Sequence, residues 1–277
     1  MSNQRRFYTL ALDIGGSFIK SALVSSSYRI IEKKQIPTPQ TKAKLNREII
    51  SLINSYKDYK WKKIGIGCPG PADYQKGIIL SPPNLAWKNF NLKQLLTSLF
   101  PGKKIIINND ANCFTLAEAR LGCGQGKKTV VGITLGTGIG GGVVIDNKIF
   151  HGKNNAGEFG HFIINKKTVE NATHQHPLVK KLGWEKIILS KTATKQSKKI
   201  DDFWQYYGRS IGKLITNITY AYDPDIIIIG GGVSKAFVKF YPWLKHELQK
   251  NLLIKPPIVV KSKLLHPGII GAALIAK

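Results

Sequence analysis

Short runs of β-branched and aliphatic residues recur along the chain, and in the longer stretches between them apolar residues return every three or four positions. The first pattern is typical of buried strands, and the second is typical of helices that cover a sheet. Strands are expected at 7–24 around a central turn, 28–36, 63–68, 103–107, 129–146, 225–229 and 258–260, and helices at 44–56, 111–121, 203–222 and 268–277. This alternation predicts an α/β fold.

The segment 129–146 has the most distinctive pattern, because two β-branched runs, 130–135 and 143–146, flank a glycine-dense turn. Backbone N–H groups with so little side chain around them form a concavity for an anion such as phosphate. A glycine-rich hairpin without a ligand would show the same pattern. The G-x-G-x-x-G spacing is also present, but a dinucleotide fingerprint requires a helix after the turn, and here a strand follows. The turn residues expected to contact phosphate are Gly136, Thr137 and Gly138.

The segment 7–24 repeats this order of strand, glycine turn and strand, since LALDIGGSFIKSALV aligns with GITLGTGIGGGVVI. Two copies suggest a duplicated architecture. The first copy has Asp13 where the second has glycine, and a carboxylate beside an anion-binding turn repels phosphate unless a divalent cation lies between them. Asp13 is therefore expected to face Mg²⁺ through water. Further phosphate contacts are expected from Gly15, Gly16, Ser17 and Lys20, although a solvated strand lysine explains Lys20 equally well.

Asp110 lies between the expected strand 103–107 and the expected helix 111–121. Aspartate is a preferred helix N-cap, and that structural role alone accounts for its position. Because α/β proteins place reactive groups in the crevice at strand ends, Asp110 is also a candidate base for a hydroxyl that attacks phosphorus. Asn84, in the irregular loop 81–87, is a candidate ligand-binding residue.

Two further segments suggest ligand contacts. The loop 154–161 holds Glu158 and His161 among glycines and asparagines, and this polar cluster suits the binding of several hydroxyls, although an isolated histidine is more often structural. A triple glycine follows a buried strand and precedes a helix, where a nucleotide or polyphosphate can rest on backbone N–H groups. These residues are Gly230, Gly231 and Gly232.

The chain is strongly basic, with 42 Lys and Arg residues against 16 Asp and Glu residues, for a net charge of +26. Such a charge favours polyanions. The lysines are spread along the chain without a nucleic-acid-binding motif, so no specific nucleic acid is expected, and a lysine-rich proteome explains the charge equally well. The basic segment 165–199 is expected to be partly helical and mobile, and nothing near its His174 and His176 completes a metal site.

Cysteine use and hydropathy bear on the compartment. Cys68, Cys113 and Cys123 are widely spaced and odd in number, which fits a reducing cytoplasm without disulfides. No apolar run approaches the roughly 20 residues of a membrane span, and the N-terminal stretch reaches charged residues too early for a signal peptide. A cytoplasmic protein without membrane contact is therefore expected.

Seven motifs together resemble the ROK family of bacterial sugar kinases, in the family's order and over nearly the whole chain: LALDIGGSFIK, PGP…NLAW, NNDANC, LGTGIGGG, AGEFGH, PDIIIIGGGVSK and PGIIGAAL. The resemblance implies a duplicated two-domain α/β fold of the actin/hexokinase-like (ribonuclease H-like) class. It implies a small N-terminal domain at 1–109, a larger domain at 110–265 and a C-terminal helix, 266–277, that packs back on the first domain. Dimers are common in that family, so a homodimer is compatible with the resemblance.

The same resemblance implies a hexose in the cleft with a nucleoside triphosphate beside it. Asp110 matches the general base for the sugar 6-hydroxyl. The other residues that match hexose-contacting positions are Asn84, Asn109, Glu158 and His161. Residues 13–17 and 136–138 match the two phosphate motifs, and 230–232 match the motif near the adenosine.

The chain departs from the family pattern at one motif. Typical members carry a cysteine-rich zinc motif after the Gly-His pair, whereas no cysteine follows Cys123 here, so zinc is not expected. The glutamate that follows this motif is a usual sugar ligand, and Glu170 is its candidate counterpart. Absence of the zinc motif is also a feature of the polyphosphate glucokinase branch, which the C-terminal part resembles. The donor is thus expected to be ATP, polyphosphate or both.

Glucokinase is the principal interpretation, and two alternatives remain. The same machinery could act on N-acetylglucosamine, N-acetylmannosamine, mannose or fructose, because the sequence gives no view of the space around the sugar C2. A sugar-binding regulator without catalytic activity is more remote, since ROK repressors carry a DNA-binding domain before the first phosphate motif and only twelve residues precede Asp13 here.

Overall fold

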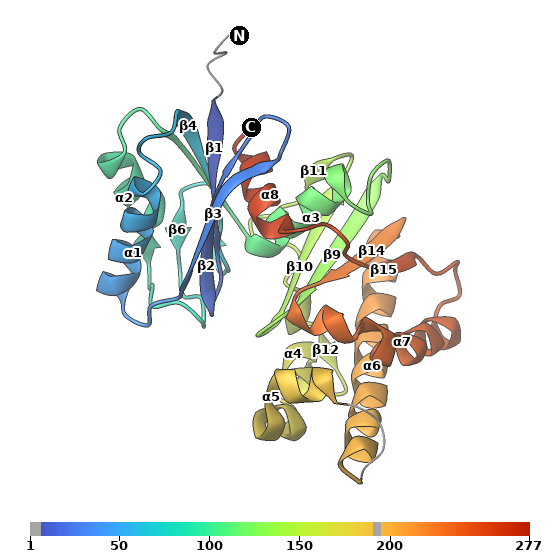
Figure 1. Cartoon of the computed structure of the whole chain (residues 1–277). Coiled ribbons are helices and arrows are strands. Elements are labelled where there is room, and N and C mark those ends of the chain that lie inside the picture. Colours follow the sequence, from blue (N-terminus) through green and yellow to red (C-terminus); the bar gives the residue numbers. More distant parts are fainter. Residues whose placement is uncertain (1–6, 191–194) are drawn as a thin grey trace.

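The computed structural model describes residues 7–190 and 195–277. Residues 191–194, part of the basic segment expected to be mobile, lie outside the described residues, as do residues 1–6. The described chain forms two lobes, each built around a five-stranded sheet (Figure 1). The amphipathic stretches of the sequence become the helices that cover these sheets.

The first sheet has the strand order β3-β2-β1-β4-β8. Strand β1 pairs antiparallel with β2 and parallel with β4, which in turn pairs parallel with β8. Large aliphatic side chains such as Leu10 and Leu12 pack on the side of helices α1 and α2, whereas alanines such as Ala11 and Ala22 face the other side. The bounds are β1 Tyr8–Ile14, β2 Phe18–Val24, β3 Ile30–Pro37, α1 Lys42–Asn54, β4 Trp61–Gly67, α2 Leu92–Leu99 and β8 Lys104–Asn108.

The second sheet repeats this arrangement in the order β11-β10-β9-β14-β15, with one antiparallel hairpin followed by two parallel strands. Two helices, α6 and α7, pack on each other and cover its outer face (Figure 1). The bounds are β9 Thr129–Leu135, β10 Ile139–Ile145, β11 Lys148–Ile149, α6 Lys195–Tyr222, β14 Ile226–Gly230, α7 Phe237–Asn251 and β15 Ile258–Lys261. Because both sheets have the same order, the predicted duplication is confirmed.

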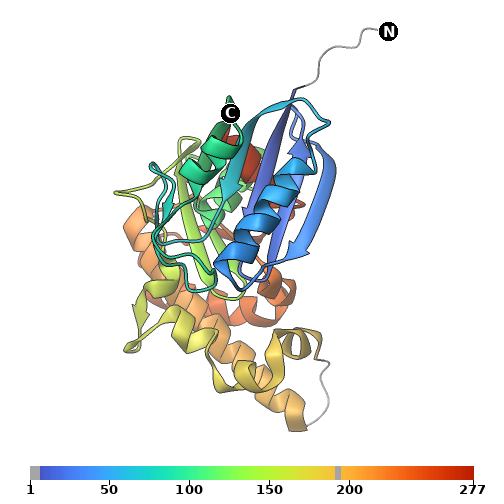
Figure 2. The ribbon, with the colours of Figure 1, turned by 90° about the vertical axis from the view of Figure 1, so that its left-hand side faces the viewer.

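Two helices lie between the sheets and join the lobes: α3 (Asp110–Leu121) and α8 (Pro267–Ile275) (Figures 1 and 2). Helix α8 packs on β1, β4 and α3, while α3 also packs on β9 and β10. Helix α8 approaches α3 very closely, because a Cβ at Gly271 would overlap the Cys113 carbonyl oxygen, and it approaches β4 as closely, because a Cβ at Gly65 would overlap the Ala272 carbonyl oxygen. We propose to divide the lobes into domains at 1–109 and 110–265, with 266–277 packed on the first.

Short elements complete the connections. A three-stranded sheet joins β5 (Ala72–Asp73), β6 (Ile78–Ile79) and β7 (Phe90–Asn91), and β12 (Ile163–Ile164) pairs with β13 (Lys167–Thr168). Two 3₁₀ turns span Phe159–His161 and Gly232–Ala236. Helices α4 (Val169–Thr173) and α5 (Pro177–Leu189) confirm that the segment 165–199 is partly helical.

The glycine-dense turn between β9 and β10 is shorter than the sequence pattern predicts. Gly140, Gly141 and Gly142 belong to strand β10 and pair with residues of β9, so the turn contains only residues 136–138. A side chain at Gly141 would overlap Phe159, and one at Gly142 would press on helix α3. These glycines therefore serve close packing rather than a wide loop.

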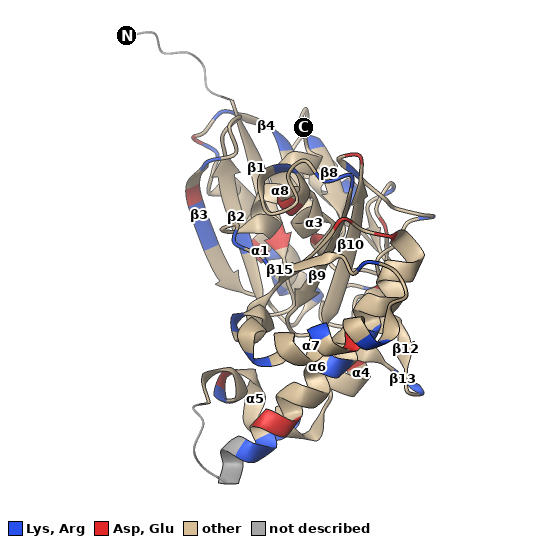
Figure 3. Cartoon of the chain, turned by 90° about the vertical axis from the view of Figure 1, so that its right-hand side faces the viewer, with Lys and Arg blue, Asp and Glu red and all other residues tan. Residues whose placement is uncertain are grey.

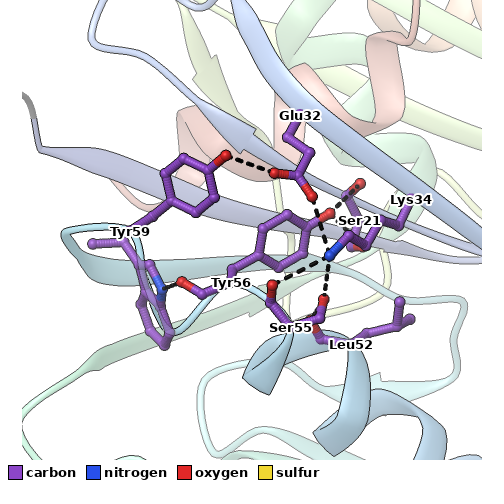
Figure 4. A network of polar contacts seen from close by, with 8 residues as sticks. Ser21, Glu32, Lys34, Leu52, Ser55, Tyr56 and Tyr59 are labelled. Carbon is purple, nitrogen blue, oxygen red and sulfur yellow. Dashed lines mark hydrogen bonds and ion pairs between the residues drawn. The ribbon is translucent and has the colours of Figure 1, made fainter.

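A polar network in the first lobe joins β2, β3 and the segment after α1 (Figure 4). Lys34 joins Glu32 at 3.0 Å to the Ser55 hydroxyl at 2.9 Å, and the Tyr59 hydroxyl donates to Glu32. The buried Tyr56 hydroxyl lies 3.0 Å from the Ser21 hydroxyl. These contacts attach the end of α1 to β2 and β3.

The sequence predicts that the chain has no membrane span and that its basic residues are spread along it. No helix in the described ranges is long and apolar enough to cross a membrane. Lys and Arg residues are spread over both lobes as seen in Figure 3.

Candidate active site

The carboxyl ends of β1, β4 and β8 meet at one edge of the first sheet, because these strands are parallel. Asp13 is the penultimate residue of β1, and Asp110 follows β8 as the first residue of α3. The N-cap interpretation of Asp110 is wrong. Asn109 is the N-cap, and its Oδ1 accepts hydrogen bonds from the N–H groups of Ala111 at 2.8 Å and Asn112 at 3.1 Å.

This local geometry leaves Asp110 available for chemistry. Its Oδ1 accepts a bond from the Ala111 N–H at 2.9 Å, while Oδ2 has no hydrogen-bond partner among the described residues. Burial, together with the negative charges of Asp13 and Glu158, raises the pKa of Asp110 to about 7. A carboxyl with a pKa near neutrality exchanges protons readily at physiological pH, as a general base requires.

The two glycine turns come from different lobes but line the same cavity. Its volume is about 260 Å³, and it lies where the first sheet, the loop around Asn84 and the second turn meet. The Asn84 loop packs directly on the first turn, because a Cβ at Gly16 would be 2.7 Å from the Asn84 Cβ. The lining residues are Gly16, Ser17, Gln40, Pro83, Asn84, Leu85, Ala86 and Thr137.

Asp13 and Lys20 form an ion pair beside the first turn, with the Lys20 Nζ 3.5 Å from Asp13 Oδ2. The start of α8 packs against the same carboxylate, since a Cβ at Gly268 would be 2.8 Å from Asp13 Oδ2. Burial raises the pKa of Asp13, and Lys20 partly offsets this effect. Lys20 therefore neutralises the Asp13 carboxylate. Its contact with phosphate stays a prediction.

Glu158, His161 and Glu170 gather on the side of the second lobe. Burial raises the pKa of Glu158, the charge of His161 opposes this shift, and the charge of Glu170 adds to it. The Glu170 Oε2 accepts a hydrogen bond from the Ile139 N–H at 2.7 Å, directly after the second turn. Glu170 thus lies beside both the turn and the Glu158 loop, and its role as a sugar ligand stays a prediction.

The triple glycine lies beside the second turn. Gly230 pairs with Thr134, and a Cβ at Gly231 would overlap the Leu135 backbone, whereas the space around Gly232 is open. Gly231 also has a φ of 84°, a conformation that favours glycine. The sequence-predicted site residues are thus distributed around one region where the lobes meet.

His174 belongs to an aromatic cluster and not to this region. Its ring lies 5.0 Å from the Trp184 ring and 6.0 Å from the Tyr207 ring, and burial lowers its pKa to about 4. In the part of the chain that the structure describes, no group of three His, Cys, Asp or Glu residues could hold a metal ion. His174 is therefore a packing residue, whereas His176 caps helix α5 by accepting a hydrogen bond from the Leu178 N–H at 3.2 Å.

Sequence reasoning missed several polar residues of the site. The Tyr74 hydroxyl accepts a hydrogen bond from the Asn109 Nδ2 at 3.2 Å, and the Asn108 Nδ2 lies 2.9 Å from the His151 Nε2. Gln40 lines the cavity between the turns, and the Asn155 Oδ1 accepts from the Ala72 N–H at 3.3 Å. Tyr74 and Gln40 belong to no glycine-rich or strand-end motif, so local sequence carried no signal for them. Asn108 ends strand β8 and Asn155 lies in the polar loop 154–161, but their partners are distant in sequence.

Two sheets with the same strand order, a glycine turn in each lobe and a carboxylate where the lobes meet define the actin/hexokinase-like class of α/β proteins. The model of the ROK family matches residues 9–176 and 171–277. The chain belongs to the ROK family, and both the predicted family and the predicted fold class are confirmed.

Named relatives narrow the class further. The chain is 31% identical to a glucokinase of Halalkalibacterium halodurans, over 83% of this chain and 82% of that protein. The structure of a ROK family glucokinase from Streptomyces griseus in complex with glucose and AMPPNP has a TM-score of 0.81 and 25% identity, covering 97% of this chain and 99% of that chain. An inorganic polyphosphate/ATP-glucomannokinase from Arthrobacter has a TM-score of 0.72 and 27% identity, covering 97% and 98%. These relatives bear out the prediction of a sugar kinase.

Proposed function

We propose that the protein is a glucokinase that transfers a phosphoryl group from ATP to the 6-hydroxyl of glucose. The observation that supports this most strongly is the half-buried Asp110 carboxyl, which follows strand β8, has a pKa of about 7 and feels the charges of Asp13 from the first lobe and Glu158 from the second. The similarity to a glucokinase structure with glucose and AMPPNP supports the same sugar and donor.

In this proposal Asp110 Oδ2 accepts the proton of the sugar 6-hydroxyl as its oxygen attacks the terminal phosphorus. The sugar hydroxyls are bound and oriented by side chains from both lobes, which holds the attacking oxygen near the donor. Backbone N–H groups of residues 16–17 and 137–138 stabilise negative charge on the transferring phosphoryl group, while the N–H groups of Gly15 and Gly136 close the two turns by donating to the Phe18 and Gly138 carbonyl oxygens. The proposed sugar contacts are Asn84, Asn109, Glu158, His161 and Glu170.

We place a Mg²⁺ ion at Asp13, mainly through water. A single carboxylate next to an anion-binding turn fits this ion, which keeps several waters and takes its other ligands from donor phosphates. Because water and donor phosphates supply the other ligands of the ion, Asp13 is the only carboxylate that this Mg²⁺ site needs. The Lys20 ammonium group lies beside Asp13 and adds a second positive charge. When bound, the ion neutralises charge on the donor phosphates.

Polyphosphate is the second donor that we propose. The net charge of +26 and the similarity to a polyphosphate/ATP-glucomannokinase favour it. We expect glucose phosphorylation with ATP and with long-chain polyphosphate, and a steep rise of the polyphosphate KM between 50 and 200 mM salt, because screening weakens many contacts at once. Steady-state kinetics at both salt concentrations test this. A polyphosphate rate at background level would leave ATP as the donor.

The sugar panel for these kinetics contains glucose, mannose, fructose, N-acetylglucosamine and N-acetylmannosamine. We expect the highest kcat/KM with glucose. A higher value with another hexose would support the alternative specificity, and no turnover of any sugar would support a regulator.

The free thiols of Cys68, Cys113 and Cys123 agree with the proposed cytoplasmic location, and the homodimer stays a prediction.

The kcat/KM for glucose is expected to depend on pH through Asp110. Only the ionised carboxyl can accept a proton, so activity should fall below a midpoint of about 7 as the pH decreases, with a slope of one. Initial rates from pH 5.5 to 8.5 measure this profile. A flat profile between pH 6 and 8 would contradict the assignment of the base.

A further inference from the structure

Tyr74 is a buried residue of the first lobe, and its side chain is 5% exposed. It lies directly after β5, in the segment that follows β4, and it is part of no glycine turn or strand-end motif. Its hydroxyl accepts a hydrogen bond from the Asn109 Nδ2 at 3.2 Å and donates one to the Cys68 carbonyl oxygen at 3.3 Å. Burial raises the pKa of Tyr74, so the hydroxyl stays neutral and can make both bonds.

The hydrogen-bonding capacity of Asn109 is almost fully used inside the protein. An asparagine side chain offers one carbonyl oxygen and two N–H donors. The oxygen of Asn109 caps α3 by accepting from Ala111 and Asn112, and this cap fixes which side of the amide carries the nitrogen. One N–H bonds to Tyr74. A single N–H therefore remains for a ligand, and its direction depends on the other three bonds.

Tyr74 also lies close to the sugar side of the site. A methyl group on Gly70 would be 3.0 Å from the Tyr74 hydroxyl oxygen, 3.1 Å from Glu158 Oε1 and 3.6 Å from Asn155 Oδ1. Glu158 and Asn155 belong to the second lobe, and Asn155 bonds back to the first lobe at Ala72. The hydroxyl of Tyr74 thus stands where both lobes converge next to Glu158.

We infer that Tyr74 is a positioning residue for the sugar: its hydroxyl locks the Asn109 amide so that the remaining N–H is presented to a sugar hydroxyl beside Asp110. This inference rests on the proposed function. It requires that the effect of Tyr74 on sugar binding passes through Asn109, and that Tyr74 leaves proton transfer at Asp110 unaffected.

Tyr74→Phe removes only the hydroxyl. We expect the glucose KM to rise about tenfold, as for one lost hydrogen bond, with kcat within twofold and an unchanged pH midpoint. Calorimetric titration of glucose without donor should show the same loss of affinity. Asn109→Ser removes the N–H donors but keeps an oxygen that caps α3. In that background Tyr74→Phe should cause no further rise of KM.

Tyr56→Phe is the matched control, because Tyr56 is also buried and its hydroxyl also makes two hydrogen bonds, here to the hydroxyl and the backbone oxygen of Ser21 (Figure 4). It should lower thermal stability without changing the glucose KM. If Tyr74→Phe does not fold, Tyr74→Met fills similar space without a hydroxyl and takes its place.

Three outcomes would overturn the inference while leaving the proposed function intact: an unchanged KM in Tyr74→Phe, an equal rise of KM in the Asn109→Ser background, or a loss confined to kcat. A wild-type protein that phosphorylates no hexose would instead overturn the proposed function. The wild-type measurement therefore separates the two failures.

Discussion

Asp110→Asn is expected to lower kcat for glucose phosphorylation by a factor of about 10² to 10⁴, the usual contribution of a general base. Asparagine preserves the shape of the side chain and keeps an oxygen that can accept the Ala111 N–H bond, so the fold and the glucose KM should change little. The measurement is steady-state kinetics with saturating donor. A variant with more than half of the wild-type kcat would remove Asp110 from the mechanism.

The same variant should also change the pH dependence of stability. Because the folded-state pKa of Asp110 is raised to about 7 from its ordinary value, the folded protein holds this proton more tightly than the unfolded chain. Stability from this group is therefore present at low pH and is lost as the pH rises through about 7. Asp110→Asn does not lose this stability and should have a higher Tm than wild type at pH 8.

Glu32→Gln is the control for the kcat prediction. It changes a carboxylate in the network of Figure 4 and should leave kcat unchanged.

Gly271→Val is expected to destabilise the fold by about 3 kcal/mol or more, because a side chain there cannot fit between α8 and α3. Its Cβ would overlap the Cys113 carbonyl oxygen, and this backbone atom cannot move aside as a flexible side chain could. Valine has a higher helix propensity than glycine, so intrinsic propensity would act in the opposite direction. Thermal unfolding followed by circular dichroism should show a Tm lower by roughly 10 °C.

Ile275→Val is the control for this prediction. It lies at the end of the same helix, keeps a β-branched residue and removes one methylene from a half-buried position, at a cost of about 1 kcal/mol. If Gly271→Val unfolded within 2 °C of this control, the close crossing of α3 and α8 would not hold the lobes together.

The sequence alone was sufficient for the main strands, for helices α1, α3, α6 and α8 and for the duplicated architecture, whereas α2 and the short strands β5, β6 and β7 were not predicted. These features depend on local periodicity and glycine density, which residues 7–24 and 129–146 display within a few turns of chain. The candidate base at Asp110 was also accessible, because it directly follows an apolar strand. Family resemblance added the sugar-side residues, which the local patterns only suggested.

Only the tertiary structure decided which of these residues form hydrogen bonds with one another and which of them shift the pKa of Asp110. The cap of α3 is Asn109 and not Asp110, and this choice frees a carboxylate oxygen. The pKa of Asp110 depends on burial and on Asp13 and Glu158, which are distant in sequence and come from both lobes. Tyr74 acts on Asn109 across 35 residues of chain. Electrostatic and hydrogen-bonding effects depend on distances in space, and a linear pattern of residues does not contain those distances.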